Sequence, residues 1–186
     1  MQAVRLVRPA ADEYDEYYHR YVRMVPDGDI TATLARQVEQ TVGPLRSLDE
    51  AGAEHAYAAG KWTVKETIGH LCDAERVFAH RALRFARGDQ TPLPGFDENS
   101  YVPAGQFGAR TLGDLLDELT AVRAATVALF RHLPPPAWTR TGSANGVGVT
   151  VRALAWIAAG HELHHRGLLE ERYGIPMGLG AVVRSD

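Results

Sequence analysis

The chain has 186 residues and a net charge of −3, from 20 basic and 23 acidic residues. This length is typical of one domain, and a composition of 45% hydrophobic and 23% charged residues is that of an ordinary globular protein. Disordered, collagen-like and rod-like coiled-coil classes are therefore excluded. The small negative charge provides no attraction to nucleic acid or anionic lipid, so we expect neither as a partner.

Three features of the sequence indicate the compartment. The longest nearly apolar stretch, residues 151–160, contains Arg152 and is much shorter than the roughly 20 residues that span a bilayer. The N-terminal sequence lacks the apolar run of a secretory signal. The single cysteine, Cys72, can form neither an internal disulfide nor a cysteine-based zinc ribbon. We therefore expect a cytoplasmic protein with no membrane helix.

The first part of the chain shows helical patterns. A tyrosine-rich polar segment, residues 12–24, is expected to form a short helix against the rest of the protein, and a Pro-Asp-Gly turn at 26–28 ends it. Asp29 can cap a following amphipathic helix, whose apolar residues recur at intervals of three and four. These are Ile30, Leu34, Val38, Val42, Leu45 and Leu48.

A second long helix begins at a capping-box signature, Thr63 to Glu66, and is expected to stop before Gly88. Residues 91–108 follow, with three prolines, three glycines and little periodicity. We interpret them as a long connection without an element of its own, of the kind that tends to cover a site.

Two further helices complete the pattern. One opens at Thr111 and stops at the prolines 134–136, and the other runs from Val151 to Arg172 behind a Thr150 cap. A Gly-, Ser- and Asn-rich turn, residues 142–148, separates them, and we find no alternating pattern long enough for a sheet. The sequence predicts an all-α, antiparallel four-helix bundle with an additional short N-terminal helix and a longer crossover loop. Residues 1–186 are expected to form one domain with its core at about 12–173, and the tail after Pro176 is expected to be loose.

Histidine is the unusual residue, with eight in the chain. His161 and His165 occupy core positions in the stripe of the last helix, about 40° and 6 Å apart, so both can reach one ion. His164 competes for the second ligand position. His70 flanks the apolar stripe in the middle of the second long helix. A lone core histidine is usually structural, but three buried imidazoles without partners would cost several kcal/mol, whereas a divalent metal would satisfy all three.

Residues 161–165 also match the His-Glu-x-x-His pattern of zinc proteases. The longer form of that motif needs a glycine where Leu168 stands, and no sheet edge is expected to align a peptide. A peptidase is therefore disfavoured. Glu162 could still act as a catalytic base that deprotonates a water on the metal.

Four sequences taken together resemble the DinB superfamily: GKWTVKE (60–66), HLCDAER (70–76), PLPGFDE (92–98) and GHELHH (160–165). The resemblance is to the branch with YfiT-type metal-dependent hydrolases and bacillithiol transferases. It implies a four-helix bundle with a divalent ion, for which we expect Zn, Ni or Fe, held by His70, His161 and His165. It also implies a low-molecular-weight thiol, bacillithiol or mycothiol, as co-substrate in S-transfer or isomerisation.

Three neutral ligands leave coordination positions open, as in catalytic sites. Cys72 lies about 200° around the helix from His70, so the reactive thiol should come from a co-substrate. Asp73 could support the site, Glu75 is expected to form a salt bridge, and Trp62 and the tyrosines are expected to pack in the core.

We expect an enzyme acting on a small molecule. A hydrolase using Glu162 and a non-catalytic metal-binding stress protein remain alternatives, and a homodimer is kept as a hypothesis.

Overall fold

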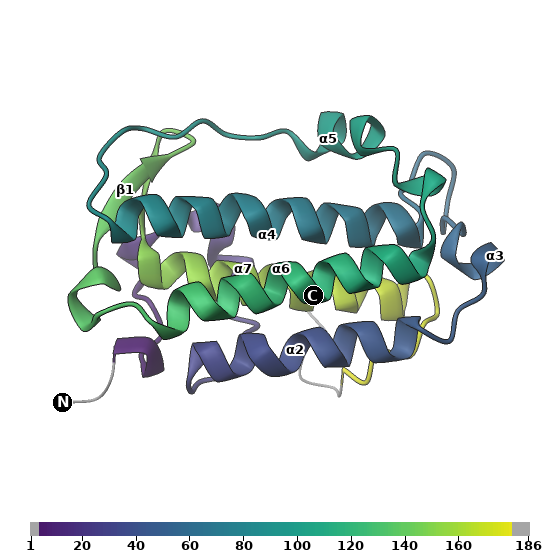
Figure 1. Ribbon diagram of the computed structural model, residues 1–186, viewed down its shortest axis with the longest axis horizontal. Coiled ribbons are helices and arrows are strands. Elements are labelled where there is room, and N and C mark those ends of the chain that lie inside the picture. The colour runs from purple at the N-terminus through teal and green to yellow at the C-terminus, as the bar shows by residue number, and fades with distance from the viewer. Residues whose placement is uncertain (1–3, 180–186) are drawn as a thin grey trace.

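Four long helices form the body of the protein in the computed structural model, which describes residues 4–179 (Figure 1). They are α2 (Ile30–Leu45), α4 (Val64–Ala86), α6 (Leu112–Arg131) and α7 (Val151–Glu171). The expected four-helix bundle is therefore confirmed. None of the helices in the described part of the chain is long and apolar enough to cross a membrane.

Each long helix begins at the capping residue that the sequence predicts. The Thr63 hydroxyl accepts a hydrogen bond from the Glu66 amide at 3.1 Å, and the Glu66 carboxylate accepts one from the Thr63 amide at 2.8 Å. The other three long helices have an N-cap without the reciprocal bond: a side-chain oxygen accepts from backbone amides of the first turn. These caps are Asp29 for α2, Thr111 for α6 and Thr150 for α7. These caps satisfy amide groups that a helix start leaves without partners.

The crossover determines the direction of the helices. In Figure 1, α4 and α6 begin at the same end, whereas α2 and α7 run the opposite way. Each long helix packs against two of the others, in the order α2, α6, α4, α7 around the bundle. Neighbouring helices are therefore antiparallel in the pairs α2–α6 and α4–α7 only, because the long connection after α4 returns the chain to the end where α4 began.

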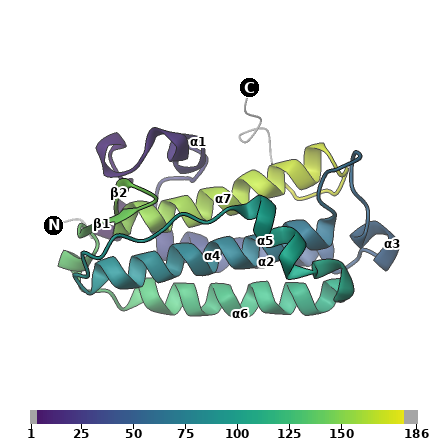
Figure 2. The same cartoon turned by 90° about the horizontal axis from the view of Figure 1, so that it is seen from above.

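The N-terminal segment differs from the single helix predicted for residues 12–24. It consists of short 3-10 turns, Val4–Leu6, Ala11–Glu13 and Glu16–Tyr18, and one turn of helix, α1 (His19–Val22). The Asp15 carboxylate accepts a hydrogen bond from the Tyr17 amide and so begins a new turn in the middle of the segment, which interrupts a continuous helix. Figure 2 shows this segment lying along α7.

Two elements appear where the sequence predicted none. Helix α5 (Glu98–Gly105) lies within the crossover, capped by Asp97, and a 3-10 turn, Phe107–Ala109, follows it. Strands β1 (Thr141–Ala144) and β2 (Val147–Thr150) form a hairpin instead of a simple turn. Asn145 and Gly146 have φ of 54° and 79°, the left-handed pair that a two-residue hairpin turn requires. A short helix, α3 (Glu50–Ala53), and a 3-10 turn, Pro135–Ala137, complete the described elements.

The hairpin fixes the crossover in place. The Leu93 amide donates to the carbonyl of Ser143 at 2.9 Å, and the Asn145 amide donates to the carbonyl of Leu93 at 3.0 Å. Figure 2 shows the crossover running from the hairpin to α5 across α4 and α7. The connection therefore covers this side of the bundle, as predicted.

The chain after α7 is more ordered than expected. Met177 is buried, and its carbonyl accepts a hydrogen bond of 2.8 Å from Arg166. The prediction of a loose tail is therefore wrong as far as residue 179, and its remainder lies outside the described residues.

Candidate metal centre

The structure brings His70, His161 and His165 together. His161 and His165 lie one turn apart on α7, and His70 faces them from α4. Nε2 of His161 is 3.0 Å from Nε2 of His70 and 3.2 Å from Nε2 of His165. One ligand atom from each residue lies within 4.8 Å of the other two, and all three side chains are buried. This cluster could hold a metal ion.

The arrangement of these nitrogens fits an ion better than it fits hydrogen bonds. A neutral imidazole Nε2 carries either one proton or one lone pair, so Nε2 of His161 cannot satisfy both neighbours at once. Metal–nitrogen bonds of about 2.1 Å in tetrahedral coordination place two ligand nitrogens about 3.4 Å apart. The separations of 3.0 and 3.2 Å are close to that value.

The surroundings keep the three imidazoles neutral, as metal ligands must be. Burial lowers the pKa of His70 to about 4, and the neighbouring His164 contributes to the shift. Burial also holds the pKa of His161 and of His165 well below the usual value. Three neutral donors are therefore available at neutral pH.

Aromatic rings surround the cluster. The Trp62 ring lies 4.8 Å from the ring of His70 and is nearly parallel to that of His165, at 6.4 Å. Tyr21 packs edge-on against His161 at 5.5 Å, and Phe78 does so at 5.7 Å. The expectation that Trp62 and the tyrosines merely fill the core is therefore incomplete, because Trp62 and Tyr21 also form walls of the site.

A cavity of about 450 Å³ opens above the three histidines. Its walls come from the N-terminal segment, α4, the crossover, the hairpin and α7. They include Tyr17, Tyr18, Arg20, Tyr21, Trp62, Phe78, Arg81, Phe96 and Asn145. The cavity is large enough for a small-molecule ligand.

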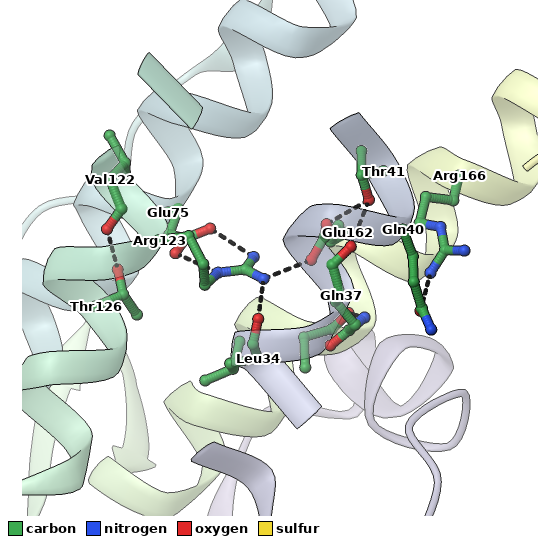
Figure 3. A network of polar contacts seen from close by, with 11 residues as sticks. Leu34, Gln37, Gln40, Thr41, Glu75, Val122, Arg123, Thr126, Glu162 and Arg166 are labelled. Carbon is green, nitrogen blue, oxygen red and sulfur yellow. Dashed lines mark hydrogen bonds and ion pairs between the residues drawn. The ribbon is translucent and has the colours of Figure 1, made fainter. Parts of the chain in front are cut away.

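Glu162 lies in the interior of the bundle, in a network of polar contacts (Figure 3). Its carboxylate accepts a hydrogen bond of 2.5 Å from the Thr41 hydroxyl and lies 2.7 Å from Nη1 of Arg123. Arg123 also binds both oxygens of Glu75 at 2.7 Å and donates to the carbonyl of Leu34 at 2.9 Å. Glu162 does not line the cavity, so it would have to leave these contacts to act as a base there.

Burial alone would lower the pKa of Arg123, but the carboxylates of Glu162 and Glu75 outweigh it and raise the pKa. Arg123 therefore keeps its positive charge, and the network connects α2, α4, α6 and α7.

The other residues considered from the sequence lie around the centre. His164 lines the cavity and packs against Tyr21 at 5.4 Å, but it is not part of the three-histidine cluster. Cys72 is buried against α6, its thiol 3.9 Å from the carbonyl of Leu115, and burial raises its pKa to about 12. Asp73 lies 3.8 Å from Arg76 on the same helix. Glu75 forms the expected salt bridge, with Arg123 across the bundle.

The family model of the DinB superfamily matches residues 15–169. The chain belongs to the DinB superfamily. A search of curated proteins gives no match.

Two solved structures share the fold of this DinB protein. YfiT from Bacillus subtilis, described as "a probable metal-dependent hydrolase with an unusual four-helix bundle topology", has a TM-score of 0.66 at 16% identity, and the match covers 91% of each chain. A mycothiol-dependent maleylpyruvate isomerase has a TM-score of 0.61 at 18% identity. That match covers 77% of this chain and 61% of the isomerase. At these identities the likeness establishes the fold alone.

Proposed function

We propose that this DinB protein is a metal-dependent enzyme that activates a low-molecular-weight thiol for S-transfer or isomerisation. The observation that carries the proposal is the convergence of three buried histidine nitrogens at the base of a cavity of about 450 Å³. A closed structural site would not need such a cavity, and a fourth protein ligand would be expected. The described residues offer only the three histidines in this cluster.

His70, His161 and His165 would hold the ion, for which Zn, Ni and Fe all suit imidazole donors. A divalent ion with three neutral ligands and open positions supplies a positive charge that lowers the pKa of a thiol or a water reaching it. Trp62, Tyr21 and Phe78 hold the imidazole rings in place and keep bulk water from their edges.

The contacts of Glu162 favour the thiol over a water as the nucleophile. A hydrolase needs a base near the attacking water, and Glu162 is held by Arg123 and Thr41 inside the bundle. A thiol of suitable pKa needs no such base once it is deprotonated. One structural relative is described as mycothiol-dependent, which supports the same choice, while the description of YfiT supports the hydrolase as second candidate.

The test is a comparison of cobalt-substituted proteins. Adding bacillithiol or mycothiol to the wild type should produce sulfur-to-metal charge-transfer absorption, and transfer to chlorodinitrobenzene should need both metal and thiol. His161→Ala should remove the absorption because it removes a central ligand. His164→Ala, the matched control on the same helix, should retain it.

Two results would contradict the proposal. If thiols only inhibit and Glu162→Gln abolishes a metal-dependent hydrolysis, water is the nucleophile. If His164→Ala loses the metal and His161→Ala keeps it, the ligand set is wrong.

A cytoplasmic location and a homodimer stay predictions. Size-exclusion chromatography with light scattering tests whether the protein is a homodimer.

A further inference from the structure

The cavity wall contains a buried arginine that has no acidic partner. Arg81 is only 4% exposed, and its Nη2 donates to the carbonyl of Pro94 at 2.9 Å. None of the ion pairs among residues 4–179 includes it. Arg123, by contrast, is buried between two carboxylates. Because burying an uncompensated charge is costly, the position of Arg81 indicates an anion supplied from outside the chain.

Arg81 lies on the same face of α4 as His70. The two are eleven residues apart, which is three helical turns, about 20° in azimuth and about 16 Å along the axis. Helical side chains lean toward the N-terminus, so the side chain of Arg81 extends back in the direction of His70. Both residues line the same cavity, which can therefore hold one ligand that reaches both.

Aromatic rings form part of the cavity wall. Phe78 stands between His70 and Arg81 along α4 and contacts His161, and Tyr18 and Phe96 also line the cavity. Two acidic residues, Asp15 and Glu98, line it as well, but neither forms an ion pair with Arg81, and Asp15 is occupied in capping Tyr17. A ligand that fits these walls has an apolar middle.

We propose that Arg81 binds a carboxylate of the substrate, at the end opposite to the group that reaches the three histidines. This inference rests on the proposed function, since it assumes that the substrate occupies the histidine end. The planar fork of a guanidinium matches the two oxygens of a carboxylate. Arg20 is exposed at the rim, with its guanidinium 4.0 Å above the Tyr17 ring, so solvent screens its charge. The substrate class is therefore a thiol with an apolar linker and a terminal carboxylate.

The experiment compares mercaptohexanoate with its methyl ester on the cobalt-loaded protein. The two probes share the thiol and the apolar chain and differ only in charge. Calorimetry measures binding, and charge-transfer absorption reports separately whether sulfur reaches the metal. The wild type should bind the acid about tenfold more tightly than the ester, or better, because a charge-assisted hydrogen bond contributes at least that much.

Arg81→Gln should bring the ratio of the two affinities close to one, whereas Arg84→Gln, a control on the same helix outside the cavity, should leave it unchanged. Arg20→Gln should have a much smaller effect. If Arg81→Gln does not unfold cooperatively, Arg81→Lys replaces it in the comparison. The lysine retains the charge, so it should lower the preference for the acid over the ester only in part.

Three outcomes would overturn the proposal: no preference in the wild type, no binding of either probe, or an equal loss of both probes in Arg81→Gln. The last would mean that Arg81 only holds the crossover through Pro94. If the acid is preferred but no charge-transfer band appears with either probe, the carboxylate site stands and the thiol function fails.

Discussion

Gly160 lets the N-terminal segment approach the three-histidine cluster, and replacing it should separate the segment from the cluster. A Cβ atom at this position would lie 2.1 Å from the carbonyl oxygen of Tyr21 and 2.4 Å from its carbonyl carbon. These are backbone atoms, so no side-chain rotation relieves the clash, and α1 would have to move by on the order of 1 Å to restore normal contact. Tyr21, which packs against His161 and His164, would move with it.

The expected cost follows from two opposing effects. Alanine in a helix interior is about 1 kcal/mol more favourable than glycine. Overpacking of a tight contact costs about 1–3 kcal/mol, so after subtraction of this gain Gly160→Ala should lower the free energy of unfolding by about 0–2 kcal/mol. Gly167→Ala on the same helix meets nothing within 4 Å and should instead stabilise the protein by about 1 kcal/mol.

Urea unfolding of the two variants measures this difference, and hydrogen exchange of residues 11–28 should become faster in Gly160→Ala alone. Metal affinity should change little, because the three histidines proposed as ligands lie on α4 and α7, while binding of small molecules in the cavity should weaken. If Gly160→Ala is as stable as Gly167→Ala, the close contact between α1 and α7 does not exist in solution.

Three further predictions concern the ion and the charges. Chelation should lower the melting temperature of the metal-loaded protein, since a ligand at a hundredfold excess over Kd stabilises by about 2.7 kcal/mol, and a His161→Ala variant that still responds to chelation would place the ion elsewhere. Without metal, the contribution of His70 to the free energy of unfolding should be fully present above pH 6.5 and should fall as the pH drops toward 4. Over that interval His70 binds a proton in the unfolded chain but not in the folded protein. The loss from this residue is about 3 kcal/mol. Denaturant titrations at several pH values test this, and an equal pH dependence in the wild type and in His70→Gln would refute the prediction. Arg123→Met should lower the free energy of unfolding by about 3–5 kcal/mol because it leaves Glu75 and Glu162 buried without a cation. Arg76→Met, which removes an exposed pair with Glu118, should cost less than about 1 kcal/mol in the same urea titration.

Features set by local chemistry could be predicted from the sequence. The four long helices and their caps follow from apolar periodicity and from Asp29, Thr63, Thr111 and Thr150. The three histidines follow from positions that interrupt or flank apolar stripes. The hairpin was missed although its Asn-Gly signal stands in the sequence, because the flanking strands have only four residues each.

Features set by distant contacts could not be predicted. Arg76 is one residue from Glu75 in sequence, but the cation that binds Glu75 is Arg123, 48 residues away. Spacing along a helix shows which side chains share a face, whereas the choice between two cations depends on how helices pack. The same limit applies to Arg81, whose burial results from the crossover folding over α4.

The ion-pair network and the histidine cluster occupy two sides of the same helix, and this arrangement explains the place of Glu162. Glu162 directly follows His161 on α7, and Glu75 lies just over one turn after His70 on α4. Arg123 of α6 binds both carboxylates and so connects the two helices that carry the three histidines. Buried ionic groups serve best to fix the register of packed elements. His70 lies on α4 and His161 on α7, so the register of these two helices determines whether the three nitrogens meet at one point. We therefore expect Glu162 to contribute to the site by holding that register, through its contacts with Arg123 and Thr41.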